Sequence, residues 1–288
     1  GMLIFELYRR TLRVLESGEA GSRQKRLDEI GKQVFLEARA AVSKLRPDRI
    51  LRYLDNMPER YRLGTPPQDI LHQIEMSEKI DADTPFVMEV THRRRLGNTL
   101  LTLVCRDQLG LFAILAGTFA SFHIKILDAK AYTDSEGLVV DSFIVVDSEG
   151  KAVTDDALWK KVRSLLDDLL SGRISVQELV EKNSKVRHPK QRVHFDIPTL
   201  VEYDLTASED DTVLEVITPD RHGLLARIAG RLADEGVSIS RAKISTEGLR
   251  AVDVFYVTDA RGGKIEDESR LRELCEILTE ELTEGSSY

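Results

Sequence analysis

Apolar and polar positions follow a strand, helix, strand, strand order over residues 214–257. An apolar run ends at Pro219-Asp220, and after Gly223 the apolar residues recur at helical spacing until Gly236. Two further apolar stretches, 237–244 and 251–257, flank Gly248 and are predicted to form strands around a turn. The positions that define the first strand and the helix stripe are Leu214, Val216, Ile217, Leu224, Leu225, Ile228 and Leu232.

The same pattern occurs earlier, over residues 102–147. Asp107 and Gly110 match Asp220 and Gly223 at an offset of 113 residues, as does the Ala129-Lys130 pair with Ala242-Lys243. The offset becomes 112 where Asp141 matches Asp253, so one turn is a residue shorter. A repeat this detailed indicates two copies of one structural unit.

The chain outside the repeats is predicted to begin with helices. We expect a helical region at 1–84, a first repeat with extra helices and a linker at 85–190, and a second repeat at 191–288. The predicted helices are 2–16, 22–46, a short one from Pro47, 68–80, 109–122, 155–170, 174–182 and 267–283. The predicted strands are 85–91, 100–105, 124–133, 138–146, 193–195 and 201–203, and 184–192 is a polar linker.

The fold class that follows is α+β, a helical subdomain followed by two tandem ferredoxin-like domains with antiparallel sheets. Such a sheet needs four strands, and each repeat contains three. The chain leaves no strand after the last helix, so the fourth strand is expected from upstream, 85–91 for the first repeat and 193–203 for the second. In the alternative, 193–195 completes the first repeat.

Composition limits the function. Hydrophobic residues make up 42% and charged residues 31%, which is typical of a soluble globular chain. The net charge of −8 argues against a general nucleic-acid or membrane-surface binder. No apolar run reaches membrane-spanning length. Cys105 and Cys275 are expected to be buried free thiols, which fits a reducing cytoplasm.

The pattern Asp-x-x-Gly-Leu-(Leu/Phe), followed by a helix and Ile-x-x-Ala-Lys, resembles the ACT domain, a small ligand-sensing module. The segments 212–225, 242–246 and 250–257 are similar to the tandem ACT region of the bifunctional uridylyltransferase/uridylyl-removing enzyme family, and 5–11 and 54–61 to the segments that follow that family's HD domain. The family's catalytic motifs are missing, since there is no Gly-Gly-Ser and no His-Asp pair. We therefore assign no catalytic residue, no metal site and no cofactor.

The two loops that join a strand to a helix are the candidate ligand sites. A helix N-terminus attracts a carboxylate, glycine allows close approach, and an Asp side chain can accept from an α-amino group. In the alternative, Asp caps the helix and Gly serves the turn. By resemblance to ACT domains the ligand also touches the start of the next strand, at a domain interface. The candidate residues are Asp107, Gln108, Leu109, Gly110, Leu111, Ile124, Lys125, Asp220, Arg221, His222, Gly223, Leu224, Val237 and Ser238.

The resemblance implies a regulatory module that senses glutamine and controls uridylylation of a PII-type signal protein. Its output would pass through the helical N-terminal part or a partner chain, either a PII-type signal protein or a separate catalytic chain, and a homodimer is expected. The alternative is a scaffold that has lost ligand binding. It is supported by the difference between the two loops at the equivalent positions Gln108 and Arg221, and by the absence from both loops of the proline that often precedes the glycine in ACT domains. A catalytic uridylyltransferase is a third, weaker hypothesis.

Overall fold

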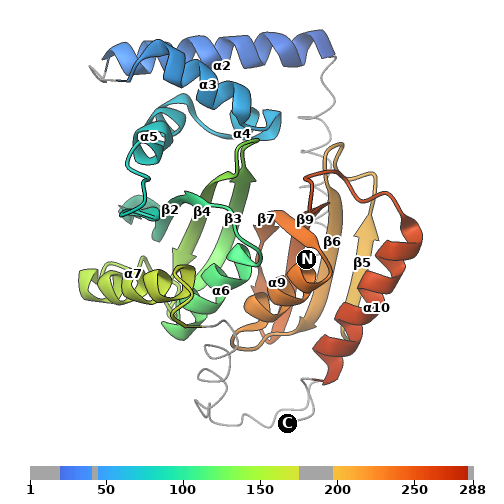
Figure 1. Cartoon of the computed structure of the whole chain (residues 1–288). Helices are drawn as coiled ribbons and strands as arrows, with labels where there is room; N and C mark the ends of the chain where they lie inside the picture. Colours follow the sequence, from blue (N-terminus) through green and yellow to red (C-terminus); the bar gives the residue numbers. More distant parts are fainter. Residues whose placement is uncertain (1–19, 41–44, 175–196, 285–288) are drawn as a thin grey trace. The chain divides into compact units, whose positions relative to one another are not determined.

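The computed structural model describes residues 20–40, 45–174 and 197–284 (Figure 1). The described chain opens with a helix of 21 residues and three shorter ones. Two of the shorter helices begin at proline, whose fixed φ suits the first helical position. Helix α4 was not predicted; it lies between Pro58 and Pro66. These helices are α2 (Ala20–Ala40), α3 (Pro47–Asn56), α4 (Glu59–Gly64) and α5 (Pro67–Ser77).

The first repeat starts with a strand pair joined by a 3-10 turn, and its last helix is capped by Asp155, whose side chain accepts from the Ala157 N–H. The exposed turn at Arg94–Leu96 contains two arginines, Arg94 and Arg95. The elements are β1 (Phe86–Arg93), η1 (Arg94–Leu96), β2 (Asn98–Arg106), α6 (Leu111–Ser121), β3 (Lys125–Thr133), β4 (Leu138–Val146) and α7 (Asp156–Leu170).

The second repeat has the same order of main helices and strands, with one extra two-residue strand in the turn before its last strand. Its elements are β5 (Leu200–Asp204), β6 (Thr212–Pro219), α9 (Leu224–Asp234), β7 (Val237–Lys243), β8 (Thr246–Glu247), β9 (Arg250–Asp259) and α10 (Glu268–Glu284).

The strands are ordered β1-β2-β4-β3-β7-β9-β6-β5, with β8 beside β9. The upstream strand β5 pairs with β6 in antiparallel register, Leu200 opposite Ile217, and β1 lies beside β2. The prediction that each repeat takes its fourth strand from upstream is therefore confirmed. The alternative strand 193–195 lies outside the described residues, as do the helix 2–16, nearly all of 174–182 and the linker 184–192.

The two repeats join edge to edge within one sheet. Strands β3 and β7 pair antiparallel, with Ala129 opposite Ala242. These two alanines are equivalent in the repeat, so their pairing lies on an approximate two-fold axis relating the copies. Helices α6 and α9 lie side by side (Figure 1). The N-terminal end of α6 meets the C-terminal half of α9, because a Cβ built on Gly110 would lie 3.9 Å from that of Ala233.

The described chain divides into two compact units. The first holds residues up to 89 together with 102–107 and 131–142, and the second holds 90–101, 108–130 and the rest from 143 onward. In the first unit the N-terminal helices share a core with strand residues of the first repeat, and Tyr61 packs edge-on against Tyr132, ring centroids 5.2 Å apart. In the second unit Phe119 packs edge-on against Phe143 at 5.3 Å. The contact between β3 and β7 and that between α6 and α9 both lie in the second unit.

Candidate functional site

The two strand–helix loops have the same hydrogen bonds. The N–H of Asp107 donates to the Gly137 carbonyl at 2.9 Å, and the N–H of Asp220 donates to the Leu249 carbonyl at 2.8 Å. Each loop is thereby tied to the turn of the following hairpin in its own repeat. Within the loops, the N–H of Leu111 donates to the backbone carbonyl of Gln108 at 3.2 Å. The N–H of Leu224 donates to the backbone carbonyl of Arg221 at 3.1 Å. The sequence repeat is therefore also a repeat of loop geometry.

A left-handed glycine precedes each helix. Gly110 has φ +73° and Gly223 has φ +74°, and each occupies the N-cap position, so no side chain caps the first turn from there. Any other residue would be strained in this conformation. Asp220 does not cap its helix; its Oδ2 accepts from the Thr246 hydroxyl at 3.4 Å. In the second loop the interpretation of Asp as a helix cap is therefore not supported.

The interface between the repeats brings one loop to the start of a strand from the other repeat. The ring of His222, in the second loop, lies 5.2 Å from the ring of His123. His123 directly precedes Ile124 and Lys125, so these predicted residues follow a contact with the loop of the opposite repeat. At the pseudo-symmetric position, Gly110 faces Ala233, four residues before Val237. The candidate residues thus gather in two places along the seam between the repeats.

The candidate residues differ in accessibility. Four of the apolar ones are core residues and present no side chain to solvent: Leu111, Ile124, Leu224 and Val237. Leu109, by contrast, is 85% exposed. Asp107, Asp220, His222, Lys125 and Ser238 are exposed, whereas Gln108, Gly110, Arg221 and Gly223 are half-buried.

Arg221 turns away from the seam. Its Nη2 donates to the Leu282 carbonyl near the end of α10, while its Nε and Nη1 have no partner among the described residues. Burial lowers the pKa of this guanidinium, and the charge of Arg227 lowers it further. Arg227 donates to the next α10 carbonyl, Glu281, at 3.1 Å. Both arginines therefore satisfy carbonyls at a helix C-terminus, where cations are favoured.

A buried carboxyl lies on the last strand of each repeat, β4 in the first and β9 in the second. Asp141 and Asp253 are both 1% exposed, so they are buried and do not lie on an exposed sheet face. Burial raises the pKa of Asp253 to about 7 and that of Asp141 well above its ordinary value, and in each case the loop aspartate raises it further. The equivalent backbone N–H groups of Tyr132 and Ser245 hydrogen-bond to them.

Sequence reasoning missed His123. It is in the left-handed region at φ 55°, at the position where the second repeat has Gly236, also left-handed. The repeat alignment contains this signal, because a histidine opposite a helix-ending glycine marks a position of backbone strain.

Over residues 20–40, 45–174 and 197–284, no group of three or more His, Cys, Asp or Glu side chains is placed to hold a metal ion. No helix in the same ranges is both long enough and apolar enough to cross a membrane.

Comparison with known proteins places this architecture in a family. Residues 212–278 match the ACT domain family, so this part of the chain is an ACT domain. The chain is a homologue of the bifunctional uridylyltransferase/uridylyl-removing enzymes. It is 34% identical over 283 residues to the enzyme of Gluconobacter oxydans and 31% identical over 284 residues to that of Rhodospirillum rubrum, in each case across 98% of this chain. To the Pseudomonas fluorescens enzyme it is 32% identical over 199 residues, which is 69% of this chain and 22% of the relative.

The chain spans 30% of the length of the Gluconobacter and Rhodospirillum relatives. A crystal structure of an unknown protein from Galdieria sulphuraria aligns at 12% identity with a TM-score of 0.20, over 64% of this chain and 92% of the other. That alignment supports no conclusion.

Proposed function

We propose that the chain is a regulatory module that binds an amino acid, glutamine, at the seam between its two ACT units and thereby controls uridylylation of a PII-type signal protein. ACT domains generally bind small amino acids, and the homology to uridylyltransferase/uridylyl-removing enzymes supports a regulatory role. A PII-type or separate catalytic partner, a homodimer and a cytoplasmic location remain predictions.

The observation that carries the proposal is the pair of loops. Each presents a helix N-terminus behind a left-handed glycine, and each lies at the contact between the repeats. Free N–H groups and the positive end of the helix suit the ligand's carboxylate, and the exposed loop aspartates suit its ammonium group.

Ligand binding at the seam would act on the packing of the repeats. The contact there consists of α6 against α9 and the pairing of β3 with β7. If the repeats can pack in two arrangements, a ligand that contacts both repeats shifts the equilibrium between them. The size of that shift is set by the difference in the ligand's affinity for the two arrangements. The position of the loops therefore supports a switch.

Calorimetric titration with glutamine, glutamate and a panel of other amino acids tests the proposal. We expect saturable binding selective for glutamine, weakened at least tenfold in Gly223→Val and in Gly110→Val, because valine is strained at positive φ. Gly262→Val is the matched control: Gly262 has φ +81° and, like Gly223, no atom within 4 Å of an added Cβ, but lies in the turn after β9. It introduces the same strain away from the seam.

Two results would oppose the sensor. Equal affinity in wild type, Gly110→Val and Gly223→Val would move the site away from the loops. No binding of any amino acid at millimolar concentration would favour the scaffold hypothesis. One structural observation favours the scaffold. The guanidinium of Arg221, in the second loop, already donates to a backbone carbonyl of α10, so this group is in part occupied without a ligand.

A further inference from the structure

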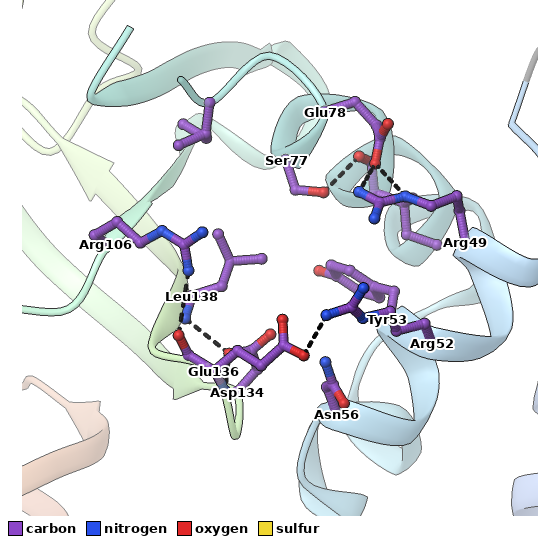
Figure 2. A pocket seen from close by; sticks show the side chains of 12 residues that line it. Arg49, Arg52, Tyr53, Asn56, Ser77, Glu78, Arg106, Asp134, Glu136 and Leu138 are labelled. Atoms are coloured by element: carbon purple, nitrogen blue, oxygen red, sulfur yellow. Dashed lines mark hydrogen bonds and ion pairs between the residues drawn. The ribbon is translucent and has the colours of Figure 1, made fainter. Parts of the chain in front are cut away.

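A cavity lies within the first compact unit. Its volume is about 290 Å³, and it opens between helices α3 and α5, the end of β2 and the β3–β4 turn (Figure 2). Three arginines from two elements turn their guanidinium groups toward it: Arg49 and Arg52 on α3, and Arg106 on β2. Glu78, Asp134 and Glu136 form the acidic part of the wall.

The three arginines are engaged to different degrees. Arg49 pairs with Glu78, and Arg52 pairs with Glu136 at 2.6 Å. Arg106 donates one N–H to the backbone carbonyl of Glu136 at 3.2 Å. No carboxylate of the described residues forms an ion pair with Arg106, so most of its donors remain available to a ligand anion.

The acidic wall is partly engaged as well. Asp134 Oδ1 accepts from the N–H groups of Glu136 and Leu138, both at 2.8 Å, and so shapes the turn. The Arg52–Glu136 pair is about half-exposed, with side chains 60% and 48% accessible. Such pairs contribute little to stability and exchange readily with a ligand's charges.

Size and charge together select the ligand. The formal charges of the six ionisable side chains cancel, so a simple anion gains no net attraction from the wall. A molecule with both an anionic and a cationic group matches it. The volume lies at the lower limit of ligand pockets, which suits a small metabolite. Ile74, Ile80 and Leu138 supply an apolar part of the wall for a short side chain.

We propose that this cavity binds a free α-amino acid, with the ligand's carboxylate on Arg106 and its ammonium group on Glu136 and Asp134. This site is separate from the loops at the seam and does not depend on the function proposed for them. It adjoins the turn that holds the first loop, since Gly137 accepts from the N–H of Asp107. An occupied cavity would therefore steady the same turn that anchors that loop.

The test is calorimetric titration of the whole chain with a panel of L-amino acids, using Arg106→Gln and Glu136→Gln. For the amino acid that binds the cavity, we expect each variant to weaken affinity at least tenfold and Arg106→Lys to restore part of it. The matched control is Arg95→Gln, which removes an exposed arginine from the η1 turn. The N-acetyl derivative and the methyl ester of that amino acid should both fail to bind there, because each lacks one of the two charges.

The outcomes separate the two sites. Binding that survives Gly110→Val and Gly223→Val but is lost in Arg106→Gln supports the cavity, even if the seam binds nothing. Binding that is lost in the glycine variants and unchanged in Arg106→Gln overturns the cavity proposal and supports the proposal that the ligand binds at the seam. Retained affinity of the N-acetyl derivative overturns the assignment of the ammonium group. No binding of any amino acid overturns both.

Discussion

His123 is the non-glycine residue of the described chain that adopts a left-handed backbone. This conformation costs about 1–2 kcal/mol relative to glycine, which the second repeat has at the equivalent position. The strained residue is the one whose ring meets His222 across the seam at 5.2 Å. Strain of this kind persists where surrounding structure holds it, and it clusters at functional sites. At the residue scale, the two repeats therefore differ at the seam, where one has a strained histidine and the other a glycine.

Asp253 makes stability depend on pH. Its pKa is about 7 in the folded chain and about 4 when unfolded, so the folded state favours the protonated carboxyl. This contribution is fully present below about pH 4 and is lost as the pH rises to about 7. Asp253→Asn cannot ionise, so we expect its stability relative to wild type to rise over that window by a few kcal/mol, roughly 4 at most.

Urea unfolding of both proteins between pH 4.5 and 8 measures this difference. Asp55→Asn, at an exposed position of α3, serves as the control and should follow the wild-type profile. Parallel curves for Asp253→Asn and wild type would show that the buried carboxyl stays ionised.

Helix α6 is buried along nearly its whole length, from Leu111 to Phe119. An amphipathic helix covers a sheet with one stripe, whereas a helix that is apolar all round needs cover on several sides. Here α9 and α7 provide it, together with the sheet. Its counterpart α9 keeps a polar face, where Arg227 and Arg231 lie near Glu281 of α10, at 3.8 and 3.7 Å. One repeated element thus has two different environments.

Phe119→Ala should be strongly destabilising. The ring is fully buried and packs edge-on against Phe143, so truncation leaves a cavity in the core, at a cost of about 3–5 kcal/mol. The equivalent substitution in the second repeat, Leu232→Ala, removes a smaller buried side chain and should cost about 2–5 kcal/mol. Denaturant unfolding gives both values. A loss below 1 kcal/mol for Phe119→Ala would mean that the helix does not pack as described.

At the scale of the whole molecule, the join between the repeats combines a backbone ladder with charges. Asp128 on β3 lies 2.7 Å from the Lys243 ammonium and 4.0 Å from Arg241, both on β7. Lys130 is the register partner of Arg241. The carboxylate of Asp128 is only 14% exposed and offsets a local excess of positive charge.

Asp128→Ala should loosen this join. Lys243 and Arg241 would then lose the carboxylate that lies 2.7 and 4.0 Å from them. We expect this loss to cost about 1–2 kcal/mol and to speed amide hydrogen exchange in β3 and β7. Asp128→Asn, which keeps the shape but not the charge, should show a similar effect if electrostatics dominates. Unchanged exchange in both variants would show that the backbone ladder alone holds the repeats together.

Most elements were predictable because their signals are local. Periodicity and the glycine and proline breaks placed β4 at 138–146 without error and α7 within one residue of its start. The internal repeat also predicted two copies of one fold with matching loops, and counting strands predicted that each sheet needs a strand from upstream. Helix α4 was missed because it has only six residues between two prolines. So short a segment holds too few apolar positions for a helical period to be recognised.

The sequence by itself therefore determined most of the elements, the repeat and the residues of the two matching loops, since each depends on residues near one another in the chain. Only the tertiary structure decided which edges meet and what each polar side chain contacts. The pairing of β3 with β7 joins residues more than a hundred positions apart, and Arg221 reaches a carbonyl 61 residues away. The cavity by Arg106 combines helices, a strand end and a turn that no spacing rule connects. Such contacts depend on how separate elements pack, which local pattern does not encode.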